Sequence, residues 1–444
     1  MSTPRKSPKR PATRTAPAPS GPNGDRPAVP VADRPVEDDF WPRVTRELAD
    51  DLAVDALARD RAGKVPFDEV ARLQEAGLPA LLTPPGPDRR GVDWRSACAV
   101  VREISAADSS VGELLAHHYA LSWTGRFLDP LRAARDPLAR AAEENWLLAG
   151  EVEPPRAESG HGLVLTPSDT DGGGWFLDGT RAFASAVTVA DRLVVGARPG
   201  GTGDQLVVLV DPGAPGVFTE AGTDRVGQRL AGAGTVTFER VPVAPGQVLG
   251  ALPHDEHAVA PFATLAPIAL RLLLVHVGLG IAEGALAEAR DISRAGHAGP
   301  APAGHPARLP ATEGAGDDPY LLLAYGELAT AAHTAAAVVE RATDALTRGL
   351  LAGWTLGAEE RADVAVLVSA AEAVAGQAAV QITTRVLELV DGAPGTGVGG
   401  GGPGFDRFWR NARALTVPTQ AAHRLRDIGD HYLNSTHARL TLLA

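Results

Sequence analysis

Two adjacent histidines, His117 and His118, have side chains that could move a proton or bind a metal ion. Imidazole titrates near neutral pH, which suits it to acid–base catalysis and to metal coordination. The sequence around them has a helical pattern, and consecutive residues on a helix point about 100° apart. The pair therefore cannot readily bind one metal ion. One histidine can face a pocket while the other packs inside, and a structural or surface role for either remains open.

Three other places carry side chains that could bind a ligand. Ser185 lies in a predicted strand, where its hydroxyl can bond to a ligand or to a neighbouring carbonyl. Arg294 follows a long predicted helix, where its guanidinium suits either a phosphate or the negative end of the helix dipole. His254 and His257 lie in a loop without a third ligand nearby. We therefore predict no metal site.

A glycine-rich run from Gly392 to Gly404 leads into the segment FDRFWRNAR, residues 405–413. The run does not follow the strand–turn–helix order of a dinucleotide-binding fold, so a Rossmann domain is not predicted. In the segment that follows, Arg407, Arg410 and Arg413 recur at a helical spacing of three. A helix with a solvated basic face is one interpretation of that pattern.

Length, charge and cysteine content limit the class of protein. The chain has 444 residues and a formal net charge of −12, which argues against a general nucleic-acid-binding protein. Cys98 is its only cysteine, so neither a disulfide framework nor a thiolate metal cluster is expected, and a cytoplasmic location fits. The most apolar window, 263–282, contains Arg271 and His276. We predict a buried core helix there rather than a membrane span.

Composition and periodicity divide the chain into four parts. Residues 1–35 are rich in Pro, Ser, Arg and Lys, lack the apolar core of a signal peptide, and predict a disordered tail. Residues 36–145 have helical periodicity, and 146–250 consist of short β-branched and aromatic runs typical of an antiparallel, barrel-like β domain. Residues 251–444 predict a bundle of four long helices. The expected fold class is α+β, with separate helical and β parts.

Five sequence blocks together resemble a known superfamily. They are EISAADSSVGELLAHHY (103–119), DGTRAFASAVTVADRLVV (178–195), VGQRLAGAGTVTFERVPV (226–243), DDPYLLLAYGEL (317–328), and FDRFWRNAR followed by RDIGDHYLN (405–434). Their types and order resemble the acyl-CoA dehydrogenase superfamily, and within it the flavin-dependent monooxygenases of the dibenzothiophene monooxygenase group. The resemblance covers about residues 38–434, which is nearly the whole chain apart from the tail.

The resemblance implies an acyl-CoA dehydrogenase-like fold and a two-component monooxygenase. Such an enzyme takes reduced FMN from a separate flavin reductase and uses O₂ to oxygenate a small organic substrate; FAD is the alternative cofactor. A helix carrying His117 and His118 would line the substrate pocket. A homotetramer with flavin sites near subunit contacts is expected, without a nucleic-acid or membrane partner.

The resemblance also assigns cofactor contacts to individual residues. Ser185 matches the serine whose hydroxyl lies at flavin N5, where it holds the N5 proton during oxygenation. Arg294 matches in part an arginine directed at the flavin phosphate. Gly392 and Ala393 match a turn whose backbone N–H groups approach the flavin across a subunit boundary.

Four positions depart from the pattern of this family. Arg181 replaces the usual lysine and Ala186 the usual glycine in the strand block. Leu415 and Pro418 stand where the family carries two histidines that act as acid or base, and neither can transfer a proton.

The glutamate base of true acyl-CoA dehydrogenases is also missing, because no glutamate lies between Phe405 and Ala444. Three functions therefore remain open. The first is a monooxygenase acting on a soft nucleophile such as sulfur or nitrogen, which needs no deprotonation. The second is an FAD-dependent acyl-CoA dehydrogenase, and the third is a non-catalytic or repurposed homologue that binds a flavin or another ligand.

Overall fold

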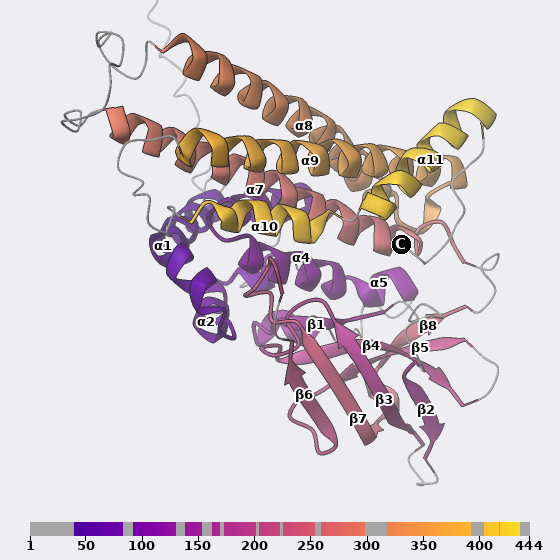
Figure 1. The fold of residues 1–444 in the computed structure, drawn as a ribbon. Helices are drawn as coiled ribbons and strands as arrows, with labels where there is room; N and C mark the ends of the chain where they lie inside the picture. The colour runs from indigo at the N-terminus through magenta and orange to yellow at the C-terminus, as the bar shows by residue number, and fades with distance from the viewer. Residues whose placement is uncertain are drawn as a thin grey trace, which may run out of the picture. The chain divides into compact units, whose positions relative to one another are not determined.

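A computed structural model describes part of the chain, namely residues 40–82, 92–129, 138–152, 162–168, 173–200, 204–222, 225–253, 259–297, 318–391, 404–416 and 418–435. The predicted tail, residues 1–35, lies outside the described residues. Within them, helices come first, strands follow, and long helices return, as Figure 1 shows. This order confirms the predicted α+β class.

The first helices pack around an apolar core shared with the later ones. They are α1 (Phe40–Ala62), α2 (Phe67–Glu75), the short 3₁₀ helix η1 (Leu78–Ala80), α3 (Trp94–Ala107), α4 (Ser109–Ser122), α5 (Thr124–Leu128) and α6 (Ala139–Glu143). Helix α4 begins at a cap, because the Asp108 carboxylate accepts hydrogen bonds from the backbone N–H groups of Ser110 and Val111. It lies between helix α7 and the strands (Figure 1), and contacts both. Side chains on α4 are therefore placed at the junction of the two parts.

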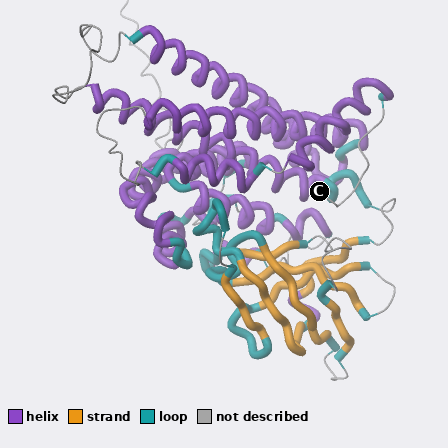
Figure 2. The backbone as a smooth tube through the Cα atoms, in the orientation of Figure 1, coloured by secondary structure: helices purple, strands orange, loops and turns teal. Residues whose placement is uncertain are grey.

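The strands are β1 (Leu148–Glu151), β2 (Val164–Pro167), β3 (Trp175–Phe183), β4 (Arg192–Pro199), β5 (Gln205–Val210), β6 (Val217–Ala221), β7 (Gly234–Val243) and β8 (Val248–Leu252). They follow the order β6-β7-β3-β2-β4-β5-β8, with β1 beside β4, and Figure 2 shows them gathered together. Most described pairings are antiparallel, as predicted, but β1 and β2 each pair with β4 in parallel. The domain is therefore mainly antiparallel, with two parallel pairings that were not predicted. The apolar core under the strands also contains Leu114, from α4.

The later helices are α7 (Leu265–His297), α8 (Pro319–Ala352), α9 (Ala358–Asp391), α10 (Asp406–Leu415) and α11 (Pro418–Asn434). The last of the four predicted helices is thus two helices, and the second begins at Pro418. Proline suits a first helical position, because it has no N–H group to bond to a preceding turn. A 3₁₀ turn, η7 (Gly353–Thr355), joins α8 to α9.

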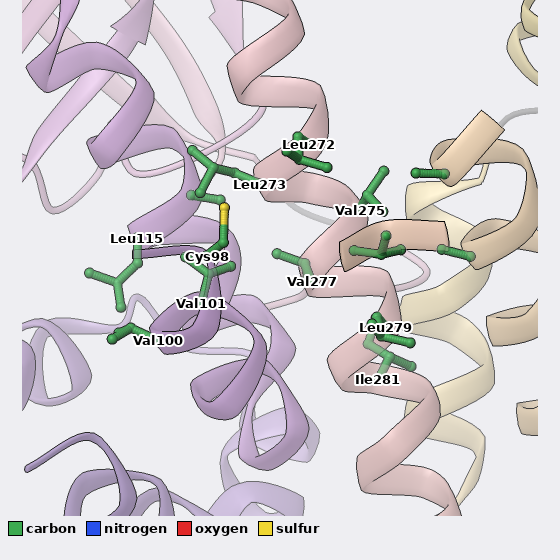
Figure 3. Close-up of a cluster of buried hydrophobic side chains, with 14 of the residues drawn as sticks. Cys98, Val100, Val101, Leu115, Leu272, Leu273, Val275, Val277, Leu279 and Ile281 are labelled. Atoms are coloured by element: carbon green, nitrogen blue, oxygen red, sulfur yellow. The ribbon is translucent and has the colours of Figure 1, made fainter. Parts of the chain in front are cut away.

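Helix α7 is the centre of the helical core. It packs against α3, α4, α8, α9 and α10. Figure 3 shows Leu272, Leu273 and Val277 of α7 in one apolar cluster with Cys98 of α3. Burial raises the pKa of the Cys98 thiol far above its usual range, which fits an apolar packing role rather than a nucleophile. The helices approach closely at Gly284, where a Cβ atom would lie 2.1 Å from the carbonyl oxygen of Ala106.

Helices α7, α8 and α9 are long and apolar enough to cross a membrane if judged by length and composition alone. In α7, 67% of the most apolar window is buried inside the protein. Its charged residues also have protein partners, since Arg271 bonds to Glu372 and Glu283 to Arg102. Helix α7 is therefore a core helix, as predicted for residues 263–282. In α8 only 28% of the corresponding window is buried, which leaves an apolar face uncovered in the single chain.

Candidate active site

A cavity of about 1730 Å³ lies where α4 and the strands meet the long helices. Its wall takes residues from α4, α5, β1, β3, α7, α9, α10 and α11, including His117, Ala184, Arg271, Gln377, Leu415 and Arg424. A pocket for one small ligand usually has about 300–1,000 Å³, so this cavity has room for two molecules side by side. Most of the wall is apolar, and Phe127, Leu270 and Leu274 contribute to it.

The two predicted histidines point in different directions. His118 is buried and does not line the cavity. Its Nδ1 accepts a hydrogen bond of 3.0 Å from the N–H of Leu148, so its Nε2 carries the proton and donates to the carbonyl oxygen of Pro79 at 2.7 Å. Burial lowers its pKa to about 4. His118 therefore joins α4 to β1 and η1 as a neutral ring. This supports the structural role that the sequence left open for it, and it leaves no ring nitrogen for catalysis.

His117 is the histidine that lines the cavity. Burial, together with the charge of Arg225, lowers its pKa to about 4. One turn earlier on the same helix lies Glu113, whose Oε1 is 4.0 Å from Nε2 of His117. Glu113 is buried, and its Oε2 has no hydrogen-bond partner among the described residues. Sequence reasoning missed Glu113, although a carboxylate four residues before a candidate histidine is a signal that could have found it.

Ser185 lies just beyond the end of β3, next to Ala184 in the cavity wall. Its side chain is buried, and its Oγ has no hydrogen-bond partner among the described residues. Buried hydroxyls normally have a partner, so this one is available for a polar atom of a bound molecule. The predicted contact of Ser185 with a flavin stays a prediction, but the orphaned hydroxyl fits it.

The usual glycine after this serine is replaced by Ala186, whose φ is +63°. This left-handed conformation costs an L-residue roughly 1–2 kcal/mol and explains why glycine suits the position. The N–H of Ala186 donates to the carbonyl oxygen of Ala231 at 2.7 Å, which fixes the turn. The turn gives Ser185 a fixed position relative to β3.

Replacing Ala186 with glycine tests this backbone strain. The substitution removes a buried methyl group but also relieves the left-handed conformation. Ala197 in β4 is equally buried and does not have a positive φ, so Ala197→Gly is the matched control. In urea unfolding, Ala186→Gly should be less destabilising than Ala197→Gly by about 1–2 kcal/mol. Equal losses in the two variants would show that position 186 is not strained.

The other predicted cofactor contacts have different outcomes. Arg294, near the end of α7, is exposed and does not line the cavity of this chain. Gly392 and Ala393 lie outside the described residues. Their contacts with a flavin stay predictions.

Charged side chains at the cavity wall were not predicted as site residues. Arg271 donates from Nε to Oε2 of Glu372 at 2.9 Å, and Nε of Arg424 lies 3.5 Å from the same oxygen. Burial lowers the pKa of Arg271, and the charge of Glu372 opposes that shift. Leu415 also lines the cavity, so the position where the family carries a histidine is an apolar part of the wall. The side chain of Pro418 lies outside the description.

Arginines of the segment 405–413 form ion pairs that connect α10 to α7 and α1, instead of forming a solvated basic face. Arg407 is buried, and its Nη1 donates to Oε1 of Glu288 on α7 at 3.3 Å. Nη2 of Arg410 donates to Oδ2 of Asp60 on α1 at 2.6 Å. The solvated interpretation was therefore wrong for these two arginines, while Arg413 is exposed and lines the cavity.

A buried amide network fixes the first turn of α4 to α10 and to the loop before β7. The N–H of Gln228 donates to Oδ1 of Asn411 at 2.7 Å, and Nδ2 of Asn411 donates to Oγ of Ser109 at 2.9 Å. Oε1 of Gln228 accepts from the hydroxyls of Ser109 and Ser110 at 3.0 and 3.2 Å. Such fully bonded networks specify one arrangement of the elements that they join. The helix that carries Glu113 is therefore held in place by two other parts of the chain.

Comparisons with known proteins agree with this geometry. Residues 37–125 match the model of the acyl-CoA dehydrogenase N-terminal domain. The chain is 32% identical over 406 residues to the dibenzothiophene monooxygenase of Rhodococcus qingshengii, covering 89% of this chain and 93% of that one. It is 29% identical to a probable FMNH₂-dependent monooxygenase, SfnC, of Pseudomonas putida, with 88% and 94% covered.

Solved structures give the same result. The FMN-bound TdsC from Paenibacillus sp. A11-2 has a TM-score of 0.78 and 28% identity, over 91% of this chain and 100% of that one. The butyryl-CoA dehydrogenase of Megasphaera elsdenii has a TM-score of 0.70 but only 20% identity, over 89% and 98%, and so shows the fold alone. These similarities favour the predicted monooxygenase over the dehydrogenase and the non-catalytic alternatives. The chain belongs to the family of flavin-dependent monooxygenases with the acyl-CoA dehydrogenase fold that includes the dibenzothiophene monooxygenases.

Proposed function

We propose that this chain is the oxygenase of a two-component system. It takes reduced FMN from a separate flavin reductase and uses O₂ to oxygenate a small organic compound at sulfur or nitrogen. One oxygen atom of O₂ goes to the substrate, and the other leaves as water while the flavin is oxidised. The observation that carries the proposal is the hydroxyl of Ser185, which has no hydrogen-bond partner among the described residues and lies beside a cavity with room for both a flavin ring and a substrate.

Reduced FMN, when bound, supplies the two electrons that activate O₂. The chain's own residues fit a role around such a ring. The Ser185 hydroxyl would hold a proton at flavin N5, because it is buried and lacks another partner among the described residues. Apolar side chains such as Phe127 and Leu274 in the wall would exclude water from the reacting atoms. Exclusion of water slows the release of reduced oxygen as hydrogen peroxide.

The proposed substrate class follows from the wall and from the relatives. A sulfur or nitrogen atom with a lone pair needs no general base, which fits Leu415 at the position of a family histidine. One relative is named as a dibenzothiophene monooxygenase, and the similar structure MsuC, from Pseudomonas fluorescens, is named as a methanesulfinate monooxygenase. Both names are those of sulfur compounds, so sulfur is the first atom to test.

We also propose that the chain works in the cytoplasm as a homotetramer. Its α8 leaves Tyr320, Leu323 and Leu351 exposed, at 84%, 62% and 81% of their surface. On α11, Tyr432 and Leu433 are also exposed. Large apolar patches on a single chain usually mark an interface, and further copies of this chain would cover them. Sedimentation at several protein concentrations measures the assembly directly.

Replacing Ser185 with alanine tests whether its hydroxyl contacts the flavin. With reduced FMN and O₂, Ser185→Ala should release hydrogen peroxide about tenfold faster than the wild type, since a preorganised hydrogen bond at the flavin is lost. The free energy of unfolding should stay nearly unchanged, because the hydroxyl has no partner among the described residues to lose. Peroxide release per reduced FMN oxidised and urea unfolding are the two measurements.

The matched control is Ser293→Ala. Ser293 is also buried, but its hydroxyl bonds to that of Tyr325 at 2.8 Å and does not line the cavity. This variant should lose about 1 kcal/mol of stability and keep the peroxide release of the wild type. If Ser185→Ala behaves in the same way as Ser293→Ala, Ser185 does not contact the flavin.

A further inference from the structure

The Glu113 carboxyl has an unusual environment for an ionisable group. It is 3% exposed, and its Oε2 has no hydrogen-bond partner among the described residues. Burial of a carboxyl group without partners is costly, so such groups occur mainly where function requires them. Its other oxygen, Oε1, faces Nε2 of His117 at 4.0 Å, one helical turn along α4. His117 in turn lines the cavity, whereas Glu113 lies behind it.

Charges around the pair favour a protonated carboxyl beside a neutral imidazole. Burial raises the pKa of Glu113 to about 7, although the positive charge of Arg225 opposes the shift. Burial and Arg225 together lower the pKa of His117 to about 4. The charge that acts on Glu113 is thus that of Arg225, from the segment between β6 and β7, while His117 lies beside Glu113 on its own helix. Arg225 also donates from Nη1 to the carbonyl oxygen of Ala184 at 2.8 Å, next to Ser185.

Two carboxylates in the cavity wall, those of Glu151 and Glu372, are already engaged. Glu151 pairs with Arg181 at 2.7 Å, and Glu372 is shared by Arg271 and Arg424. Among the described residues, neither has a fully buried oxygen without a hydrogen-bond partner, as Glu113 has. Among these three carboxyls, Glu113 is therefore the one best placed to hold a proton for the cavity.

We propose that Glu113 and His117 form a proton relay in which the carboxyl supplies, through the imidazole, the proton that oxygenation consumes. The inference rests on the proposed function. Anionic reduced FMN brings two electrons and one proton to the reaction. One atom of O₂ enters the substrate, and the other leaves as water, which requires one further proton.

In the relay, that proton moves from the Glu113 carboxyl to Nε2 of His117, while Nδ1 gives its own proton to the departing oxygen. To reset the relay, Nδ1 of His117 takes a proton from water and Nε2 returns its proton to the carboxylate of Glu113, so both groups regain their starting protonation states. The present 4.0 Å between Oε1 and Nε2 must shorten to about 3 Å, which a side-chain rotation achieves. In these roles His117 is the catalytic residue and Glu113 acts through it.

The first test needs neither flavin nor substrate. Infrared difference spectra of the protein between acidic and neutral pH should contain the C=O band of a protonated carboxyl that titrates near pH 7. This band should be absent from Glu113→Gln, which keeps the shape of the side chain. Its presence in Glu113→Gln, or its absence from the wild type, would overturn the inference.

The second test is the pH profile of product formation with reduced FMN, O₂ and dibenzothiophene as the probe. Wild-type kcat should fall as the pH rises above about 7, because Glu113 then loses its proton. At neutral pH, Glu113→Gln should lower kcat about a hundredfold, leave KM unchanged and remove the decrease of kcat above pH 7. Glu113→Asp should restore part of the rate. Glu103→Gln, which changes an exposed carboxyl of α3 outside the cavity wall, is the matched control and should keep the wild-type profile.

The outcomes separate the two proposals. If the wild type forms oxygenated product, and Glu113→Gln has the same kcat and the same decrease of kcat above pH 7, the relay is wrong and the proposed function stands. If neither FMN binding nor oxygenation of any sulfur or nitrogen probe occurs in the wild type, the proposed function fails and the relay fails with it. An infrared band that titrates as expected would then mark Glu113 as a buried acid without this role.

Discussion

Replacing Asp108 with alanine should lower the free energy of unfolding by about 3 kcal/mol, the low end of the range for a broken buried ion pair. Asp108 is buried, and its Oδ2 accepts a hydrogen bond of 2.9 Å from Nη2 of the buried Arg59. Burial lowers the pKa of Arg59, but the charge and hydrogen bond of Asp108, together with the charges of Asp55 and Glu69, outweigh this and leave that pKa raised. Without Asp108, the guanidinium keeps Asp55, Glu69 and the carbonyl oxygen of Leu52 as partners among the described residues.

The same carboxylate caps the helix that carries the site. Oδ1 of Asp108 accepts from the N–H groups of Ser110 and Val111 at 3.1 and 3.4 Å. Loss of the cap alone costs about 1 kcal/mol. The first turn of α4 should therefore loosen in Asp108→Ala, and Glu113 and His117 should lose their fixed positions. Urea unfolding gives the stability, and amide hydrogen exchange across α4 gives the loosening.

Asp93→Ala is the matched control for Asp108→Ala. Asp93 caps α3, where it accepts from the N–H of Ser96 at 2.9 Å, but it is exposed. This variant removes a cap without breaking a buried ion pair, and should cost about 1 kcal/mol. Equal losses in the two variants would mean that the pair of Arg59 and Asp108 contributes nothing measurable.

Replacing Glu113 with glutamine should change how stability depends on pH. Folding raises the pKa of Glu113 from 4.5 to about 7. A carboxyl group whose pKa is higher in the folded protein than in the unfolded chain stabilises the folded state. This stabilisation is complete at pH values below the pKa in the unfolded chain. It is lost as the pH rises through the pKa in the folded protein. The shift corresponds to about 3 kcal/mol. Relative to Glu113→Gln, the wild type should therefore lose about that amount between pH 4.5 and pH 7.

The measurement is the difference between the unfolding free energies of wild type and Glu113→Gln at several pH values. The buried ring of His118 titrates in the opposite sense, but it is present in both proteins and cancels in the difference. Glu103→Gln, at an exposed carboxyl outside the cavity wall, is the matched control. If the curve for Glu113→Gln does not differ from that for Glu103→Gln, the carboxyl of Glu113 is not the buried acid that the site requires.

The sequence was sufficient for the fold and for part of the site. Apolar periodicity and turn residues predicted helices, then strands, then helices, and motif resemblance placed them in the correct superfamily. Helical geometry also predicted that His117 and His118 diverge. It could not say which of them faces a cavity, since that depends on Pro79 and Leu148, which come from other elements.

Contacts over long sequence distances explain what the sequence did not predict. The spacing of Arg407 and Arg410 indicated one basic face, but their partners Glu288 and Asp60 lie 119 and 350 residues away. The burial of Glu113 likewise depends on elements that pack over α4 from distant parts of the chain. The parallel pairing of β1 with β4 has no local signal either, since pairing direction is set by the path of the chain between strands.

A crystal structure of the protein with FMN tests the central claim most directly. The isoalloxazine ring should lie in the cavity between α4, β3 and α7, with Oγ of Ser185 within about 3 Å of a ring nitrogen. His117 should face the space left for a substrate. A ring bound elsewhere, or one in the cavity with the Ser185 hydroxyl turned away from it, would contradict the account.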